Sequence, residues 1–327
     1  MTPPSKGAPR RIHMFLDDAT NLDFHRALAT QARQEVEKLE GVLGEPVLLS
    51  FYECFGSQLQ QRKLVLEVAA QLSPQTEDLI CLLPTDAYAI QELQSALFAG
   101  PGVSWPGGRR RLVCAIMHQL LPEELAGEAR ALGRRLFSVC ADQAEMGALQ
   151  ASQIVHLLSR KSDRERRIVF VSGPSHSGAT RLRIAGAVEQ LLEQNIVVEP
   201  THSDWSGAKT RDALKEWKAA GNELQTLAAI AAQNDQIADA AKEWLLSEGR
   251  GDIPVLGMDG TDELGKLLVD CGKLYATVKQ PLGIAEAFDT YRRLLVEGDA
   301  LDDIHENFNR RLSPESYPPI ATLAPIP

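Results

Sequence analysis

The sequence lacks the cysteine and histidine patterns of metal and redox sites. Its five cysteines are widely spaced, odd in number and without a CxxC pair, and its seven histidines form no HxH or HxxxH. These spacings exclude the common zinc ligand sets and a disulfide framework. We therefore expect no metal and no cofactor, and free thiols in a reducing compartment.

Long apolar runs are missing as well. The basic N-terminus, MTPPSKGAPRRIHMFLDD, is not followed by the apolar core of a signal peptide, and no later stretch is long enough to span a membrane. As written, the sequence predicts a cytoplasmic protein, which would be periplasmic if an export signal had been removed. The net charge of -10 argues against nucleic acid as a partner, because phosphate backbones would be repelled.

The residues show no constellation of a nucleophile with a base, so we do not expect an enzyme. The segment from Gly173 to Thr180 approaches the phosphate-loop pattern GxxxxGK[ST], but Ala179 occupies the lysine position. Without that charge, nucleotide binding is disfavoured. Gly173 and Gly178 are then interpreted as a turn residue and a helix-entry residue.

What the sequence does have is a regular alternation of short apolar runs and helical periodicity, typical of parallel sheets covered on both faces. The predicted strands are Ile12–Asp17, Pro46–Tyr52, Leu79–Leu83, Leu112–Met117, Leu136–Ala141, Ile168–Ser172, Ile196–Glu199, Thr226–Ala232, Pro254–Met258 and Tyr275–Lys279. The predicted helices include Phe24–Glu40, Gln58–Leu72, Gln143–Ser159, Ala179–Gln194 and Asp235–Ser247.

Ten strand–helix units are too many for one compact open sheet, so the chain is expected to form two α/β lobes, each with a doubly wound parallel sheet. The first lobe should comprise residues 11–141 with about 282–298, and the second residues 142–281. Residues 299–327 should return through a hinge that the chain crosses several times and end in an extended tail. Disorder is expected in residues 1–10 and, because of their prolines, in residues 313–327.

Ligands of such sheets gather at the carboxyl ends of the strands. Asn234, Asp259 and Gln280 follow predicted strands there, and Trp205 stands in the polar loop SDWSG. Each has an alternative role. Asn234 or Asp235 could cap the next helix, Trp205 could be partly buried packing, and Asp262 is the expected cap of the helix after Asp259.

Together with Arg183, these side chains suit a carbohydrate. Arg183, Asn234, Asp259 and Gln280 offer several donors or acceptors in a plane, which match neighbouring sugar hydroxyls. An indole such as Trp205 packs on the apolar C–H face of a sugar ring.

Three blocks, Ala231–Asp235, Val255–Thr261 and Gly272–Gln280, resemble the C-terminal half of the type I periplasmic sugar-binding proteins. Ribose-binding protein and the ligand-binding core of lac-repressor-type regulators belong to this superfamily. The segment Thr180–Gly186 is similar to the one in which these families place a ligand-binding arginine, here Arg183. By the same resemblance Trp205 stacks on the sugar, and Asn234, Asp259 and Gln280 contact it.

The N-terminal half matches the superfamily less well. Asn21 and Phe24 are weak matches for the Asn and the aromatic residues that follow the first strand in these families. After the fourth strand, Met117 and His118 replace the usual Asp-Arg pair, so His118 is either a ligand contact or a structural residue.

The resemblance implies a solute-binding protein that captures a small carbohydrate or polyol between its lobes. Closure would be sensed by a membrane permease or a sensor kinase. The alternative is a cytoplasmic sensor or regulator of the same fold whose site has diverged to a non-sugar ligand or has lost its ligand.

Overall fold

The computed structural model describes residues 9–17, 22–72, 77–84, 113–131, 135–162, 165–175, 177–296 and 308–326. The chain divides into two compact units, and their main boundary lies between Cys140 and Ala141. The first unit comprises Met1–Asn21, His25–Cys140 and Leu282–Leu312. The second comprises Leu22–Phe24, Ala141–Pro281 and Ser313–Pro327.

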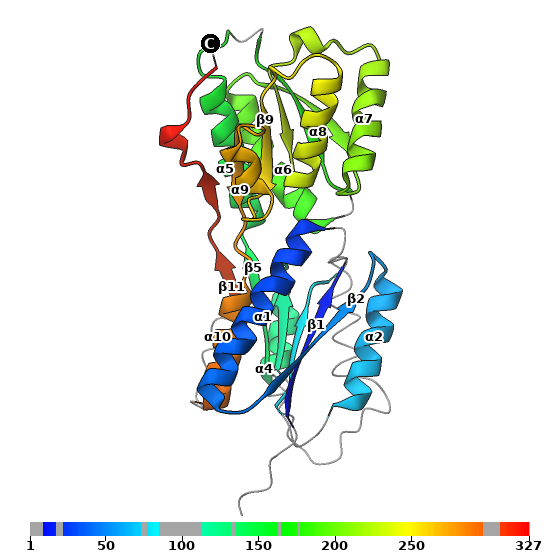
Figure 1. Ribbon diagram of the computed structural model, residues 1–327, viewed down its shortest axis with the longest axis vertical. Coiled ribbons are helices and arrows are strands. Elements are labelled where there is room, and N and C mark those ends of the chain that lie inside the picture. The colour runs from blue at the N-terminus through cyan, green and yellow to red at the C-terminus, as the bar shows by residue number, and fades with distance from the viewer. Residues whose placement is uncertain are drawn as a thin grey trace, which may run out of the picture. The chain divides into compact units, whose positions relative to one another are not determined.

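The first unit is built on a six-stranded sheet in the order β11-β5-β4-β3-β1-β2. Its strands are β1 (Arg10–Leu16), β2 (Val47–Glu53), β3 (Leu79–Leu82), β4 (Val113–Met117), β5 (Arg135–Ala141) and β11 (Asn309–Leu312). Figure 1 labels its strands β1, β2, β5 and β11. Strands β1 to β5 pair in parallel. Its described helices are α1 (Asp23–Leu43), α2 (Gln58–Gln71), α4 (Glu123–Ala131) and α10 (Ile284–Val296).

The second unit repeats this design with the sheet order β12-β10-β9-β8-β6-β7. Its strands are β6 (Arg167–Ser172), β7 (Val197–His202), β8 (Ala229–Ala232), β9 (Val255–Asp259), β10 (Ala276–Lys279) and β12 (Glu315–Tyr317). Its helices are α5 (Gln143–Leu157), α6 (Gly178–Glu193), α7 (Gly207–Ala219), α8 (Asp235–Ser247) and α9 (Gly265–Asp270). The doubly wound two-lobe architecture is therefore confirmed.

Alternation along β6 shows why these residues form a central strand. Ile168 and Phe170 pack into one hydrophobic cluster with residues of α5 and α6, whereas Val169 and Val171 pack into another with residues of α7 and α8. Successive side chains of a strand point to opposite faces, so a strand covered on both faces must be apolar throughout.

The C-terminal segment departs from the expected disorder, and that prediction is wrong for residues 313–326. Strand β12 pairs antiparallel with β10, and the tail then binds α5, where the Ile326 amide donates to the Leu157 carbonyl at 3.1 Å. Farther back, the Tyr275 hydroxyl donates to the Ala324 carbonyl at 2.9 Å. The tail is ordered by an existing sheet edge, which proline content does not reveal. At the other end, residues 1–8 lie outside the described residues, and Arg10 already belongs to β1.

Two further predictions of local structure are wrong. The predicted strand Thr226–Ala232 is too long: Thr226 is the last residue of a 3-10 turn, Leu224–Thr226, and β8 starts only at Ala229. Asp262 does not cap a helix, because α9 starts three residues later at Gly265. Its carboxylate instead pairs with Lys266, 2.6 Å away.

Candidate ligand-binding site

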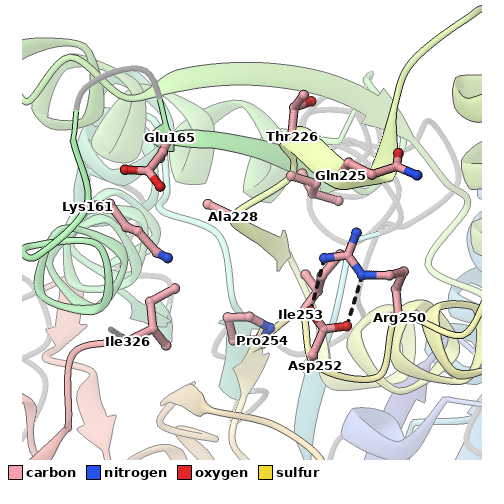
Figure 2. A pocket seen from close by; sticks show the side chains of 11 residues that line it. Lys161, Glu165, Gln225, Thr226, Ala228, Arg250, Asp252, Ile253, Pro254 and Ile326 are labelled. Atoms are coloured by element: carbon pink, nitrogen blue, oxygen red, sulfur yellow. Dashed lines mark hydrogen bonds and ion pairs between the residues drawn. The ribbon is translucent and has the colours of Figure 1, made fainter.

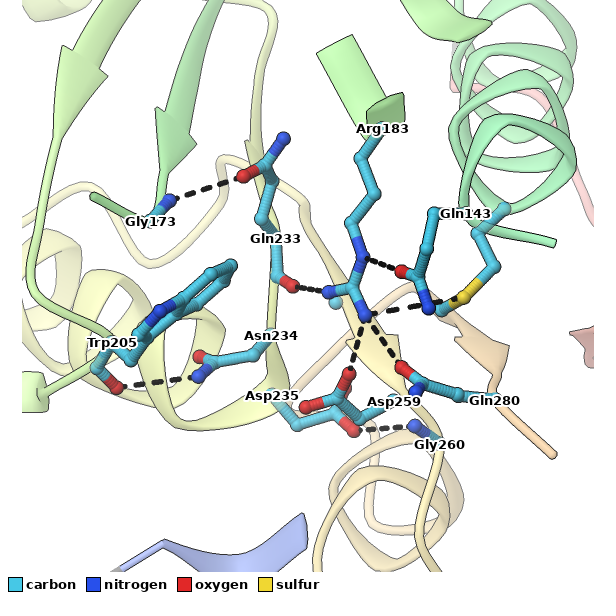
Figure 3. A network of polar contacts seen from close by, with 12 residues as sticks. Gln143, Gly173, Arg183, Trp205, Gln233, Asn234, Asp235, Asp259, Gly260 and Gln280 are labelled. Atoms are coloured by element: carbon cyan, nitrogen blue, oxygen red, sulfur yellow. Dashed lines mark hydrogen bonds and ion pairs between the residues drawn. The ribbon is translucent and has the colours of Figure 1, made fainter. Parts of the chain in front are cut away.

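Polar side chains of the second unit meet around one guanidinium group, that of Arg183, at the carboxyl ends of β8, β9 and β10 (Figure 3). Arg183 projects from the second turn of α6 and is only 4% exposed. Five of the predicted ligand contacts lie in this region: Arg183, Trp205, Asn234, Asp259 and Gln280.

Helix packing fixes where Arg183 stands. Helices α5 and α6 cross so closely that a Cβ on Gly147 would lie 2.0 Å from the Arg183 carbonyl oxygen. Reciprocally, a Cβ on Gly186 would lie 1.9 Å from the Ala144 carbonyl oxygen. The first two turns of α5 and the second and third turns of α6 are thus packed backbone against backbone.

Protein acceptors surround the Arg183 guanidinium. Its Nε donates to Gln143 Oε1 at 2.7 Å, and one terminal nitrogen donates to the Gln233 carbonyl. The other terminal nitrogen donates to Gln280 Oε1 and pairs with Asp259 Oδ1 at 3.3 Å. A guanidinium presents five donors in a fixed fork, so these contacts orient the acceptors as firmly as they hold the arginine.

Asp259 is the anionic member of the group, with 14% of its side chain exposed. Burial raises the pKa of its carboxyl group, and the Arg183 charge opposes that rise. Its backbone is in the left-handed region at φ 92°, followed by Gly260 at φ 57°. A non-glycine residue keeps such a conformation only where its surroundings impose it.

Trp205 provides the flat apolar surface. Its ring is half-buried, and the Arg183 guanidinium carbon lies 5.8 Å from the ring centroid. A Cβ on Gly173 would lie 2.2 Å from the indole, so glycine is needed there to leave room for the ring. Gly173 lies in a bend directly after β6, so its interpretation as a turn residue stays a prediction, and the ring adds a second reason for glycine there. Gly178 does begin α6.

Asn234 is the N-cap of α8. Its side-chain oxygen accepts the Ile237 amide at 2.6 Å, and its side-chain nitrogen donates to the Trp205 carbonyl at 3.2 Å. One amide thus starts the helix and fixes the tryptophan loop. The predicted alternative, that Asp235 is the cap, is wrong: Asp235 is the first residue inside the helix, and its carboxylate points to the turn after β9.

Phe24 is another predicted contact that lies near these groups. The segment Leu22–Phe24 at the start of α1 clusters with the second unit rather than with the rest of its helix. A narrow cavity of that unit is lined by Asp23, Phe24, Asn234, Asp235, Gln236, Asp259, Thr261 and Leu264. The Thr261 hydroxyl is buried there and has no hydrogen-bond partner among the described residues.

The two remaining predicted contacts stay predictions. Asn21 lies outside the described residues. His118 belongs to the first unit, where it follows β4 at φ 61° and its amide donates to the Val139 carbonyl at 2.9 Å.

Sequence reasoning missed three residues of the network: Gln143, Gln233 and Asp235. The side chain of Gln233 accepts the Gly173 amide at 3.1 Å and donates to the Thr180 carbonyl at 3.2 Å, so it ties the loop after β6 to α6. The sequence offers one signal for Gln143. It is the first of three glutamines, with Gln150 and Gln153, that interrupt the apolar face of α5.

A larger cavity, of about 500 Å³, opens at the opposite, amino ends of β6, β8 and β9 (Figure 2). It contains none of the predicted contacts. Its best-placed cation, Arg250, already forms a two-pronged pair with Asp252, at 2.9 and 3.0 Å. The Arg183 region is therefore the candidate site, because the larger cavity gathers no comparable set of buried polar groups from the described part of the chain.

Comparison with known proteins finds similarity to periplasmic binding proteins. A sequence model described as a periplasmic binding protein domain matches residues 130–289. The ribose import binding proteins of Escherichia coli (strain K12) and Salmonella typhimurium are each 27% identical over 124 residues, which are 38% of this chain. The match spans only 40% of the length of these relatives.

Solved structures share the fold over nearly the whole chain. A solute-binding protein from Bacillus halodurans with bound myo-inositol has a TM-score of 0.69 at 17% identity, with 95% of each chain covered. One from Actinobacillus succinogenes with bound D-allose has a TM-score of 0.66 at 19% identity, with 94% of this chain and 96% of the other covered. The chain therefore has the fold of these solute-binding proteins and resembles the type I periplasmic-binding-protein superfamily in sequence over residues 130–289.

Members of this superfamily are typically periplasmic ligand-binding proteins rather than enzymes. Within the described residues, no helix has the length and apolar character of a membrane span. No group of three or more His, Cys, Asp or Glu side chains is placed to hold a metal ion in that part of the chain.

Proposed function

We propose that the protein is a solute-binding protein whose ligand is a small carbohydrate or polyol. The observation that carries this is the set of polar groups around Arg183, with the half-buried indole of Trp205 beside it. Sugar hydroxyls both donate and accept, so they suit a site that offers a carboxylate, amides and a guanidinium within a few ångströms.

Asp259 and Thr261 are the proposed direct contacts on the polar side. Arg183 binds one carboxylate oxygen of Asp259, and the buried Thr261 hydroxyl lines the same cavity. Trp205 is the proposed stacking surface, and Gln280 and Asn234 complete the set. In this proposal Arg183 chiefly orients Asp259 and Gln280, because its donors already face protein acceptors.

The names of similar proteins support the same ligand class. They include binding proteins for ribose, myo-inositol, D-allose and fructose, and several are solute-binding proteins of ABC transporters. We propose a membrane permease of that kind as the partner that reads the bound state. The alternative of a diverged or lost site is less favoured, because the second unit retains a buried polar network around Arg183.

Thermal unfolding against D-ribose, D-allose, myo-inositol and D-fructose tests the proposal. A sugar at about one hundred times its dissociation constant should stabilise the protein by about 2.7 kcal/mol. Asp259→Asn should weaken its binding roughly tenfold to one-hundredfold, the range expected for losing a charge-assisted hydrogen bond. Asp252→Asn, in the cavity at the other end of the unit, is the matched control and should leave binding unchanged. A sugar that stabilises Asp259→Asn as strongly as the wild type would place binding elsewhere.

A further inference from the structure

A second carboxylate, that of Asp235, lies beneath the turn that presents Asp259. Asp235 is 2% exposed. Its Oδ2 accepts the Gly260 amide at 2.7 Å, and its Oδ1 accepts the Thr277 hydroxyl at 2.7 Å. One side chain at the start of α8 thereby joins the turn after β9 to strand β10.

Two glycines leave the space that this carboxylate occupies. A Cβ on Gly257, in β9, would lie 2.2 Å from Asp235 Oδ1, and a Cβ on Gly265, the first residue of α9, would lie 2.1 Å from Oδ2. Atoms at such distances overlap, so neither position tolerates a side chain while Asp235 is in place. The pocket around the carboxylate is therefore shaped by three elements of the fold.

This arrangement is not explained by stability. Burial, and next the negative charge of Asp259, raise the pKa of Asp235 well above its ordinary value. Among the described residues no lysine or arginine forms an ion pair with Asp235, and Arg183 acts on it only at longer range. Burying a carboxyl group with dipoles as its only close partners costs stability, so a role in the site is the better explanation.

The turn that Asp235 holds is the strained one. Asp259 and Gly260 are both left-handed, and the Gly260 amide meets Asp235 Oδ2 in that conformation. We propose that Asp235 is a positioning residue, which fixes the Asp259–Gly260 turn so that the Asp259 carboxylate faces Arg183 and the ligand. The proposal rests on the proposed function, in which Asp259 contacts the sugar.

The glycines make a sharp test possible. Sugar affinity would be measured by calorimetry for Asp235→Ala, Gly257→Ala and the double variant, with whichever of D-ribose, D-allose and myo-inositol the wild type binds most tightly. Gly257 is chosen because a Cβ there overlaps only Asp235, whereas one on Gly265 would also lie 2.8 Å from the Gly260 Cα. Each single variant should weaken binding about tenfold or more, the effect of losing a buried hydrogen bond to a charged group. The double variant should be no weaker than Asp235→Ala alone, because the new methyl group occupies the vacated space.

Two further variants separate positioning from a general loss of stability. Asp235→Asn keeps an oxygen for the Gly260 amide and can donate to the Thr277 hydroxyl, so it should bind within about threefold of the wild type. Leu245→Ala leaves a cavity in the core about 15 Å farther along α8 and should lower Tm without changing the affinity. Unchanged affinity in Asp235→Ala, or losses that add up in the double variant, would overturn the proposal.

A measurement that needs no ligand, hydrogen exchange of the Gly260 amide, tests the positioning role of Asp235 independently of the ligand class. The amide proton of Gly260 should resonate downfield in the wild type, and its exchange with solvent should accelerate in Asp235→Ala and in Gly257→Ala but not in Leu245→Ala. If none of the three sugars binds while the Gly260 amide behaves this way, the ligand class is wrong and the positioning role of Asp235 stands. A Gly260 amide that exchanges equally in all variants would refute it.

Discussion

Gly173 illustrates how a single missing side chain shapes the candidate site. The Trp205 indole covers its backbone, and its amide is held by the side chain of Gln233. Trp205 itself is left-handed at φ 72°, so its loop depends on such contacts, including the hydrogen bond from Asn234 to its carbonyl. The stacking surface therefore exists because of three residues that need not touch a ligand.

We predict that Gly173→Ala displaces the indole. A methyl group 2.2 Å from the ring must push it aside, which should cost about 1–3 kcal/mol of unfolding free energy and weaken sugar binding. Urea denaturation and calorimetric titration would measure both effects. Gly178→Ala is the matched control, because a Cβ there meets nothing within 4 Å, and it should change neither quantity. Equal behaviour of the two variants would contradict the packing described here.

At the scale of elements, the crossing of α5 and α6 positions the arginine of the site. We predict that Gly147→Ala and Gly186→Ala each lower the unfolding free energy by about 3 kcal/mol, because the methyl group meets a carbonyl oxygen of the other helix and only a backbone shift makes room. That shift moves Arg183, so sugar affinity should fall with stability.

Two helical glycines that meet nothing serve as controls for this pair. At Gly41 in α1 and at Gly127 in α4, no atom lies within 4 Å of the place that a Cβ would take. Gly41→Ala and Gly127→Ala should therefore stabilise the protein by about 0.5–1 kcal/mol. Thermal unfolding of all four glycine variants measures these changes in stability. If Gly147→Ala were also stabilising, the close crossing would be incorrect.

The elements themselves were predictable where a strong periodic signal exists. The helix Asp235–Ser247 has the predicted bounds, and the apolar runs of β6 and β9 mark buried parallel strands. Predictions failed where a long-range contact decides the structure. Strand β12 forms because β10 offers an edge, and Gln143 becomes part of the site because α6 brings Arg183 to it. Neither partner is near in sequence, so local pattern could not reveal them.

At the scale of the whole molecule, the two units carry buried titratable groups of opposite kind. In the first unit, burial lowers the pKa of His13 to about 4, and the nearby Arg11 charge acts in the same direction. His13 is 5% exposed, and its Nδ1 lies 3.0 Å from the Tyr52 hydroxyl. In the second unit, burial raises the pKa of both Asp235 and Asp259.

These shifts should make acid act differently on the two units. Because the pKa of His13 is about 6.5 when unfolded and about 4 when folded, the unfolded chain binds the proton more tightly, and stability falls as pH drops below 6.5. The loss should reach about 2 kcal/mol between pH 7 and pH 5. For Asp235 and Asp259 the folded pKa is the higher one, so their destabilising effect is present at neutral pH, lessens as pH falls below the folded pKa and is gone below the unfolded pKa.

Scanning calorimetry between pH 7 and pH 5 measures how the stability of each protein depends on pH. Because many surface groups also titrate, the contributions of His13 and Asp235 are obtained by comparing variants with the wild type. His13→Gln should remove part of the acid-induced loss of stability. The free energy of unfolding of Asp235→Asn, relative to that of the wild type, should be more favourable at pH 7 than at pH 5. Because a chain of two units need not unfold in one step, acid should lower the transition of the first unit relative to that of the second. Parallel pH profiles for the wild type and His13→Gln would show that His13 is not a buried neutral group.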